Sequence, residues 1–182
     1  MIIAIGLLEF NSISQGIKVA DIMKKAADVE IIMAQPTCPG KYTVLISGSV
    51  SAVNASVESG VAESGPFLVD HMVISRIHHQ LLNAMNGTTE IGDVNAVGVL
   101  EYFSVASAIV GADAAVKSAE IDLMQVRLAT GLGGKAYVTF SGDVGAVKQA
   151  LETGAAANED NGMLYNKIMI SSPDKDLFKT LL

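Results

Sequence analysis

The chain contains one segment twice, and this duplication limits its fold more than any other feature of the sequence. Residues 4–33 align without a gap with residues 96–125, and 10 of the 30 positions are identical. Residues 40–60 align in the same way with residues 134–154, with 10 identities in 21 positions. Chance similarity between apolar segments does not explain two ungapped blocks in the same order. We therefore expect two copies of one unit, a first domain over residues 1–90 and a second over residues 91–182.

Each copy has the hydrophobic pattern of strand, helix, strand, strand, helix, strand and short helix. In the first copy, strands are expected over residues 2–8, 29–33, 42–46 and 67–74, and the short helix over residues 78–85. The two longer helices are expected to begin after Ser12 and at Gly48-Ser49, and Asp143 is the expected cap in the second copy. A tight turn at Pro39-Gly40 makes the strands on either side antiparallel. The predicted fold class is α/β (α+β), with a four-stranded antiparallel sheet covered by helices in each copy.

Composition and charge exclude several classes of function. Half of the residues are hydrophobic, which is enough for a real core. The 12 basic residues are outnumbered by 19 acidic ones, and the net charge is −7. Nucleic acid and anionic membranes attract clustered Lys and Arg, so we expect neither as a partner. A single cysteine, Cys38, excludes an intrachain disulfide framework.

The sequence contains no pattern of catalytic residues that we can assign to an enzyme. Glu9 and Glu101 occupy matched positions in the two copies, as do Asp21 and Asp113, and structural hydrogen bonding is their expected role. No nucleophile, base and orienting group occur in a known order, and no metal-ligand spacing is present. We therefore expect a protein that is not an enzyme.

The segment Gly131-Leu132-Gly133-Gly134 suggests a dinucleotide-binding loop at first sight. Such a loop requires a helix directly after it, because the helix N-terminus binds the pyrophosphate. The residues that follow, Ala136 to Phe140, have the pattern of a strand. A turn between two strands is therefore the favoured interpretation.

Four segments together resemble the shell proteins of bacterial microcompartments, in the class with tandem domains that forms trimers. Residues 113–119 match the first-helix signature, residues 131–135 the glycine-rich pore loop, and residues 141–147 the start of the next helix. Residues 74–78, Ile-Ser-Arg-Ile-His, are similar to the Ile-Pro-Arg-Pro-His segment of the family. The second copy departs from that segment and reads Ser171-Ser172-Pro173-Asp174.

The resemblance implies a structural tile located in a microcompartment shell within the cytoplasm. Three chains would form a homotrimer that is a pseudohexamer, with other shell proteins and possibly an encapsulated redox enzyme as partners. The implied pore loops consist of Thr37, Cys38, Pro39 and Gly40, and of Gly131, Leu132, Gly133 and Gly134. The implied lateral contacts between tiles are Lys25, Arg76, His78 and Lys117.

The sequence Thr37-Cys38-Pro39-Gly40-Lys41 is similar to the iron–sulfur, propanediol-utilisation type of this class. That likeness implies a [4Fe-4S] cluster on the trimer axis, held by Cys38 from three chains for electron transfer across the shell. Three equivalent thiolates suit the threefold axis of a cubane, since one chain supplies only one cysteine. The backbone N–H groups of Gly40 and Lys41 are candidate donors to sulfur.

Three alternatives to the cluster remain open. A tetrahedral zinc site with three cysteines is chemically compatible with the same arrangement. A tile without any cofactor would carry Cys38 as a plain thiol and conduct metabolites through its pore. A ligand-binding sensor built on a duplicated α/β fold is the third alternative.

Overall fold

The computed structural model describes residues 4–89 and 94–176, and the chain divides into two compact units. The first unit contains the residues up to Ile77 together with Ala129–Gly134. The second unit contains His78–Leu128 and the residues from Lys135 onward. The predicted domain boundary between residues 90 and 91 lies outside the described residues.

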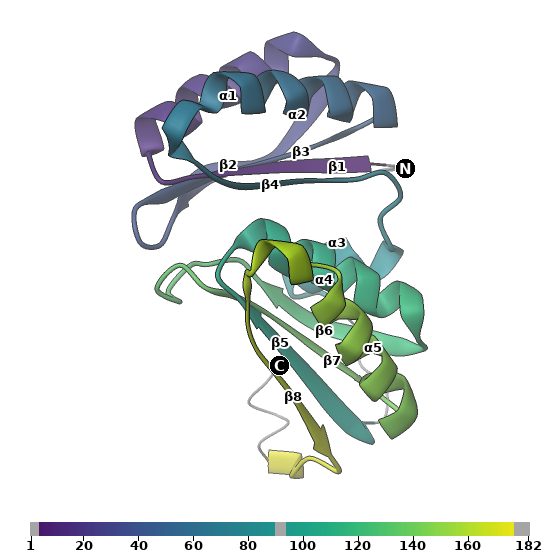
Figure 1. Ribbon diagram of the computed structural model, residues 1–182. Coiled ribbons are helices and arrows are strands. Elements are labelled where there is room, and N and C mark those ends of the chain that lie inside the picture. The colour runs from purple at the N-terminus through teal and green to yellow at the C-terminus, as the bar shows by residue number, and fades with distance from the viewer. Residues whose placement is uncertain (1–3, 90–93, 177–182) are drawn as a thin grey trace. The chain divides into compact units, whose positions relative to one another are not determined.

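The first unit is an antiparallel sheet with strand order β2-β3-β1-β4, and two helices cover one of its faces (Figure 1). Its elements are β1 (Ala4–Phe10), α1 (Ile13–Ala26), β2 (Val29–Thr37), β3 (Lys41–Gly48), α2 (Val50–Ser64), the 3₁₀ helix η1 (Gly65–Phe67) and β4 (Leu68–Ile74). The predicted order of strands and helices is confirmed.

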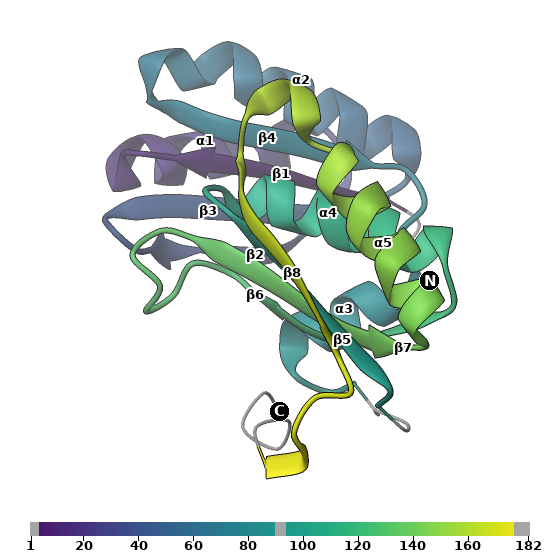
Figure 2. The ribbon, with the colours of Figure 1, turned by 60° about the horizontal axis from the view of Figure 1, so that its bottom comes forward.

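The second unit repeats this architecture and adds one helix in front of it. Its elements are α3 (His79–Asn86), β5 (Ala96–Tyr102), α4 (Val105–Ser118), β6 (Ile121–Arg127), β7 (Ala136–Gly142), α5 (Val144–Ala156), the 3₁₀ helix η2 (Glu159–Asn161) and β8 (Leu164–Ser171). The strand order β6-β7-β5-β8 matches that of the first unit, and the register matches too, with Ala4 opposite Gly48 and Ala96 opposite Gly142. Helix α3 packs on the edge strand β6 (Figure 2). The predicted fold class is confirmed.

Serine side chains cap the long helices at three positions. The hydroxyl of Ser12 accepts a hydrogen bond from the backbone N–H of Gln15 at 3.4 Å, as predicted. Ser104, its equivalent in the second unit, caps α4 in the same way. Ser49 caps α2, where its hydroxyl accepts a hydrogen bond from the N–H of Ala52 at 3.2 Å. Asp143 does occupy the N-cap position of α5, but its carboxylate accepts a hydrogen bond from the Asn95 side chain at 2.8 Å instead. The predicted N-cap residue of α5 is right, although its side chain makes no capping hydrogen bond.

Two strands extend further than their sequence pattern indicates. Strand β2 continues to Thr37 through Pro36, and its ladder with β3 ends at the pair of Thr37 and Lys41. Proline is tolerated there because β2 is an edge strand in its sheet. Strand β1 continues to Phe10, which lies opposite Tyr42 of β3. Part of the predicted first strand, residues 2 and 3, lies outside the described residues.

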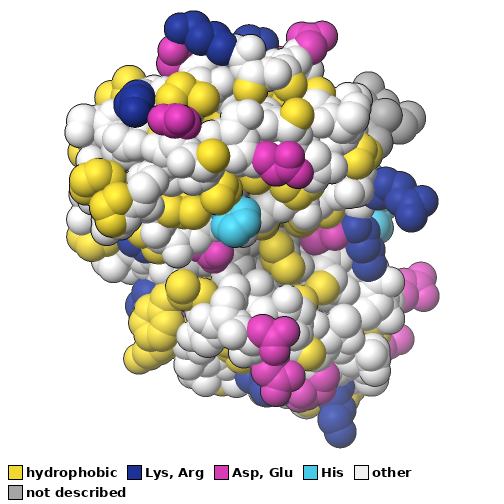
Figure 3. All heavy atoms as spheres, turned by 45° about the horizontal axis from the view of Figure 1, so that its top comes forward, with side chains coloured by type: hydrophobic (Ala, Val, Ile, Leu, Met, Phe, Trp, Pro, Cys, Tyr) yellow, Lys and Arg dark blue, Asp and Glu magenta, His cyan; other side chains and the backbone are white. Residues whose placement is uncertain are grey.

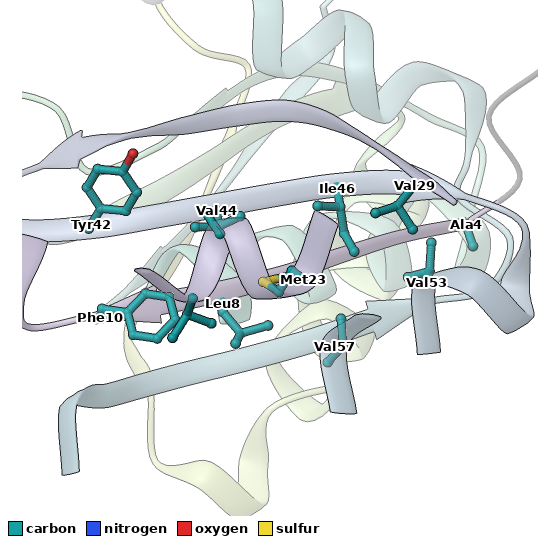
Figure 4. Close-up of a cluster of buried hydrophobic side chains, with 12 residues drawn as sticks. Ala4, Leu8, Phe10, Met23, Val29, Tyr42, Val44, Ile46, Val53 and Val57 are labelled. Carbon is teal, nitrogen blue, oxygen red and sulfur yellow. The ribbon is translucent and has the colours of Figure 1, made fainter. Parts of the chain in front are cut away.

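The core of the first unit lies between the sheet and its two helices (Figure 4). Leu8, Phe10 and Met23 are completely buried there, together with side chains of β3 and α2. Burial of one such side chain stabilises a fold by about 1.5–3 kcal/mol. This packing fixes the sheet, and the sheet in turn positions the β2–β3 turn that holds Cys38.

Candidate pore loops and cysteine site

Cys38 lies at the tip of the hairpin that joins β2 to β3. The backbone N–H of Gly40 donates a hydrogen bond to the carbonyl of Thr37 at 3.1 Å, and this bond closes the turn. Gly40 has a φ of 85°, which favours glycine, and the Cys38–Pro39 peptide bond is cis. Cys38 is a free cysteine of intermediate burial and is not part of the core. The hairpin therefore presents one thiol per chain at an outer turn.

The turn is anchored beneath Cys38 by a pair of buried hydroxyls. The side chains of Thr37 and Thr43 lie 3.1 Å apart across the two strands, and both residues are buried. The expectation that the Gly40 N–H faces the sulfur is not met, because that N–H donates to the Thr37 carbonyl. The hydrogen bond that closes the turn therefore uses this donor.

The glycine-rich loop belongs to the same compact unit as the Cys38 turn. Its backbone has positive φ at Ala129, Gly131, Gly133 and Gly134, and strand β7 follows it, as predicted. A Cβ at Gly134 would lie 2.6 Å from Cδ of Pro39 and 3.1 Å from the carbonyl oxygen of Cys38. The two predicted pore loops therefore touch, and only glycine fits at the point of contact.

Each loop ends at a lysine that pairs with a carboxylate on the first strand of its copy. Nζ of Lys41 lies 2.8 Å from Oε1 of Glu9, whose side chain is completely buried. Lys135 pairs with Glu101 in the equivalent place, and this hydrogen bond raises the pKa of Lys135. The structural role expected for the two glutamates is confirmed. Sequence reasoning missed the lysine partners, although the matched pair Lys41 and Lys135 was visible in the repeat.

An aromatic cluster lies next to Lys135. The ammonium of Lys135 lies 4.4 Å from the ring centroid of Tyr165, and Tyr165 meets Phe103 edge to face with centroids 5.0 Å apart. The first copy has Asn11 in place of Phe103. The surroundings of Lys135 therefore differ from those of Lys41, its equivalent in the first copy. We found no sequence signal for the cluster, because the aromatic residues are far apart along the chain.

The donor set decides which metal groups the Cys38 turn can hold. In the described part of the chain, no three His, Cys, Asp or Glu side chains lie close enough together to bind a metal ion. One chain offers a single thiol at the turn, whereas iron–sulfur clusters are held by several thiolates. The residues therefore fit a cluster, or a zinc ion, only where turns from several copies meet.

The predicted lateral-contact lysines lie on equivalent helices in equivalent ion pairs. Lys25 of α1 pairs with Asp21 at 2.5 Å, and Lys117 of α4 pairs with Asp113. The Lys25 side chain is 74% exposed and that of Lys117 is 42% exposed, so both ammonium groups reach the surface. The positions of these lysines are consistent with a role between tiles, and that role stays a prediction.

The other two predicted lateral-contact residues lie at the junction between β4 and α3. Arg76 is exposed in the bend after β4. His78 is the N-cap of α3: its Nδ1 accepts a hydrogen bond from the N–H of Gln80 at 3.4 Å, and its own N–H donates to Oδ1 of Asp113 at 2.8 Å. Burial, followed by the neighbouring His79, lowers the pKa of His78. His78 is thus tied into the second unit.

On the face shown in Figure 3, basic side chains of the described residues lie in separate small groups and form no continuous stripe. Among the helices of the described residues, none is long and apolar enough to cross a membrane.

Comparison with known proteins assigns the family. The model of the BMC domain matches residues 4–77 and, a second time, residues 96–173. This chain belongs to the BMC domain family. It is a tandem BMC protein, since the two matches cover the two copies of the repeat.

Relatives that match both copies of the repeat are microcompartment and carboxysome proteins. The chain is 35% identical to the bacterial microcompartment shell protein PduT of Citrobacter freundii over 98% of this chain and 97% of that protein. It is 29% identical to the carboxysome assembly protein CcmO of Synechococcus elongatus over 98% of this chain and 68% of that protein. A crystal structure of a microcompartment protein from Desulfitobacterium hafniense is 42% identical and superposes with a TM-score of 0.84, covering 97% of this chain and 98% of the other.

These findings confirm the predicted family and its location. The tandem BMC protein is a bacterial microcompartment shell protein, and the shell is its location. The family assembles into shells, so other shell proteins are its partners at this coarser level.

Proposed function

We propose that this shell protein forms a homotrimeric, pseudohexameric tile and holds a [4Fe-4S] cluster through Cys38 from three chains. Three copies of two BMC domains would close a ring of six. The tile would be structural and conductive, and it would have no enzymatic activity of its own. The cluster would pass electrons across the shell or to a redox enzyme inside it.

The position of Cys38 carries this proposal. The only cysteine of the chain lies at the tip of an outer hairpin turn, partly exposed, whereas a purely structural cysteine is usually buried in the core. Likeness to PduT over nearly the full length supports the same type of tile. The donor chemistry agrees, since thiolate is the usual ligand of iron in such clusters.

A bound cluster of this kind supplies one-electron transfer, and the residues around the turn hold its ligand in place. The hydroxyl pair of Thr37 and Thr43 and the Gly40 hydrogen bond fix the backbone on either side of the thiol. Glu9 neutralises Lys41 at the base of the turn. Gly134 lets the neighbouring loop approach the turn closely.

The proposed tile contacts its neighbours through Lys25, Lys117, Arg76 and His78. The ammonium groups of the two lysines are exposed, and both helices present them at equivalent positions. The glycine-rich loop and the Cys38 turn would line the pore, and a bound cluster would close it to metabolites.

The test is the iron content of the trimer, measured on protein purified without oxygen and without added metal. Four iron and four sulfide per three chains, a visible charge-transfer band, and an EPR signal after dithionite are expected. The variant Cys38→Ala should lose all three signals. The matched control Cys38→Ala/Ala55→Cys keeps one thiol per chain on the exposed face of α2 and should lose them as well.

Two results would contradict the cluster. Colourless, iron-free trimers that still form sheets would leave a tile with a metabolite pore. Zinc at one equivalent per three chains, lost in Cys38→Ala, would assign the three-cysteine zinc site.

A further inference from the structure

The connection between α5 and β8 is longer than its equivalent between α2 and β4. Gly60 aligns with Gly154 in the repeat. Leu68 and Leu164 also correspond, because each pairs with the last residue of the first strand in its copy. The segment 61–67 between these points has seven residues, and its equivalent 155–163 has nine. The second copy therefore has two additional residues next to the start of β8.

A surface pocket of about 330 Å³ lies at this connection, within the second unit. Helix α5 packs against β8, and the chain passes from one to the other through η2 (Figure 2). Ala155 and Ala156 of α5 and Leu164 of β8 form the apolar part of the lining. The first copy has the larger Val61 in place of Ala155. Sites for small molecules have volumes of about 300–1,000 Å³, so this pocket suits a small ligand.

The charged groups of the lining favour a cation. Glu152, Glu159 and Lys167 line the pocket, which gives two carboxylates and one ammonium. Oε2 of Glu152 lies 2.5 Å from Nζ of Lys167, so these two charges neutralise each other. In the part of the chain that the structure describes, no salt bridge neutralises Glu159. Helix α5 also ends at this wall, at Ala156, and the C-terminal end of a helix carries a partial negative charge.

Side-chain amides hold the η2 wall of the pocket in place. Asn158 is only 7% exposed, and its Nδ2 donates to the carbonyl of Ser107 at 2.9 Å. Nδ2 of Asn161 lies 3.1 Å from Oγ of the same serine, and Oδ1 of Asn161 accepts the N–H of Met163 at 3.0 Å. These bonds tie η2 to α4, which contains Ser107. A pocket whose wall is already ordered costs less entropy when a ligand binds.

We propose that this pocket binds a small organic ammonium ion, an alkylamine in its protonated form. The carboxylate of Glu159 and the C-terminal end of α5 bind the ammonium group, and Ala155 and Leu164 contact the alkyl part. An inorganic cation would leave the apolar wall unused, and an alcohol would leave the charge of Glu159 uncompensated. The site does not depend on the proposed cluster or trimer, because every residue that lines it belongs to the second unit of one chain.

Titration of the full-length protein with propylammonium chloride, followed by isothermal titration calorimetry, tests the proposal. We expect saturable binding at one equivalent per chain. The alcohol 1-propanol, which has nearly the same shape and no charge, should bind far more weakly. Glu159→Gln should raise the Kd for propylammonium about tenfold, because it removes the charge from the hydrogen bond to the ligand. The matched control Asp160→Asn removes a charge from the same 3₁₀ helix but outside the lining, and its Kd should stay unchanged.

Ala155→Val tests the cavity, since it introduces the side chain that the first copy has at this position. Its Kd should rise at least as much as that of Glu159→Gln, with a folded protein verified by circular dichroism. Glu159 is exposed, so Glu159→Gln decides the question even where the valine variant does not fold. Cys38→Ala should bind propylammonium as the wild type does, which separates this site from the proposed cluster.

Three results would overturn the proposed site. Absence of saturable binding would exclude propylammonium as a ligand of this pocket. Equal affinities for propylammonium and 1-propanol, or an unchanged Kd in Glu159→Gln, would show that Glu159 does not bind an ammonium group. Displacement of propylammonium by an equal concentration of potassium chloride would assign a site for inorganic cations instead.

Discussion

At the scale of single residues, the hydroxyl of Tyr102 makes a buried hydrogen bond that has no equivalent in the first copy. Its side chain is completely buried, and its hydroxyl donates to the carbonyl of Gly154 at 2.9 Å, whereas the first copy has Phe10 in this place. Burial raises the pKa of Tyr102, so the hydroxyl stays a donor at any working pH. We expect Tyr102→Phe to lower the free energy of unfolding by about 1–2 kcal/mol in urea titrations.

Tyr137→Phe is the control for this prediction. Its hydroxyl donates to Gln125 at 3.0 Å but the residue is only partly buried, so the loss should be smaller. Equal losses in the two variants would contradict the role assigned to burial.

His78 makes the docking of α3 sensitive to acid. Its Nδ1 accepts the N–H of Gln80, and a protonated imidazole has no free acceptor. Burial and His79 lower the pKa of His78, Asp113 raises it, and Lys117 lowers it. The unfolded chain therefore binds a proton more readily, and stability falls as the pH drops through 6.5 toward the folded pKa.

The variant His78→Asn tests this dependence, since asparagine caps helices at every pH in this range. We expect thermal melts of the wild type to lose stability between pH 7 and about 5.5. The variant should lose less over the same interval. Parallel curves for the two proteins would count against a role for His78 in this dependence.

At the scale of elements, the ion pairs Lys41–Glu9 and Lys135–Glu101 are equivalent but lie in different surroundings. Glu9 is 0% exposed and Glu101 is 29% exposed. Removing one partner of a buried pair leaves an unpaired charge in the protein interior, which lowers the free energy of unfolding by about 3–5 kcal/mol. An exposed pair contributes only about 0–1 kcal/mol to that free energy. We expect Lys41→Met to destabilise the protein by about 3 kcal/mol and Lys135→Met by about 1 kcal/mol, measured by urea unfolding.

The double variant Glu9→Gln/Lys41→Met separates charge from packing. It removes both charges together and should recover most of the stability lost in Lys41→Met. A double variant as unstable as the single one would show that packing of the lysine stem, and not its charge, supports the turn.

At the scale of the whole molecule, the two lysines proposed for the lateral contacts should control sheet formation without affecting the trimer. Lys25 and Lys117 lie on the surface of equivalent helices, and each is already paired within its own helix. We expect Lys25→Ala/Lys117→Ala to form trimers by native mass spectrometry but no sheets by electron microscopy. Lys18→Ala, which also removes an exposed ion-paired lysine of α1, should keep the sheets. Sheets that persist in the double variant would contradict the proposed lateral contacts.

The sequence by itself determined the features that depend on local pattern. We could predict the duplication, the order of strands and helices, the Ser12 cap and the turn at Cys38. Each of these depends on hydrophobic periodicity or turn residues within a short stretch of the chain. The end of β2 was not, since Pro36 stops most strands and is tolerated only at a sheet edge, which is a property of the whole sheet.

The tertiary structure alone decided which parts of the chain meet. It paired Lys41 with Glu9 across 32 residues and brought Gly134 against Pro39. It also packed α3, which follows the first copy in sequence, onto β6 of the second unit, and left β2 exposed. Such pairings depend on how distant segments fold back on one another, and no local period of the sequence encodes that.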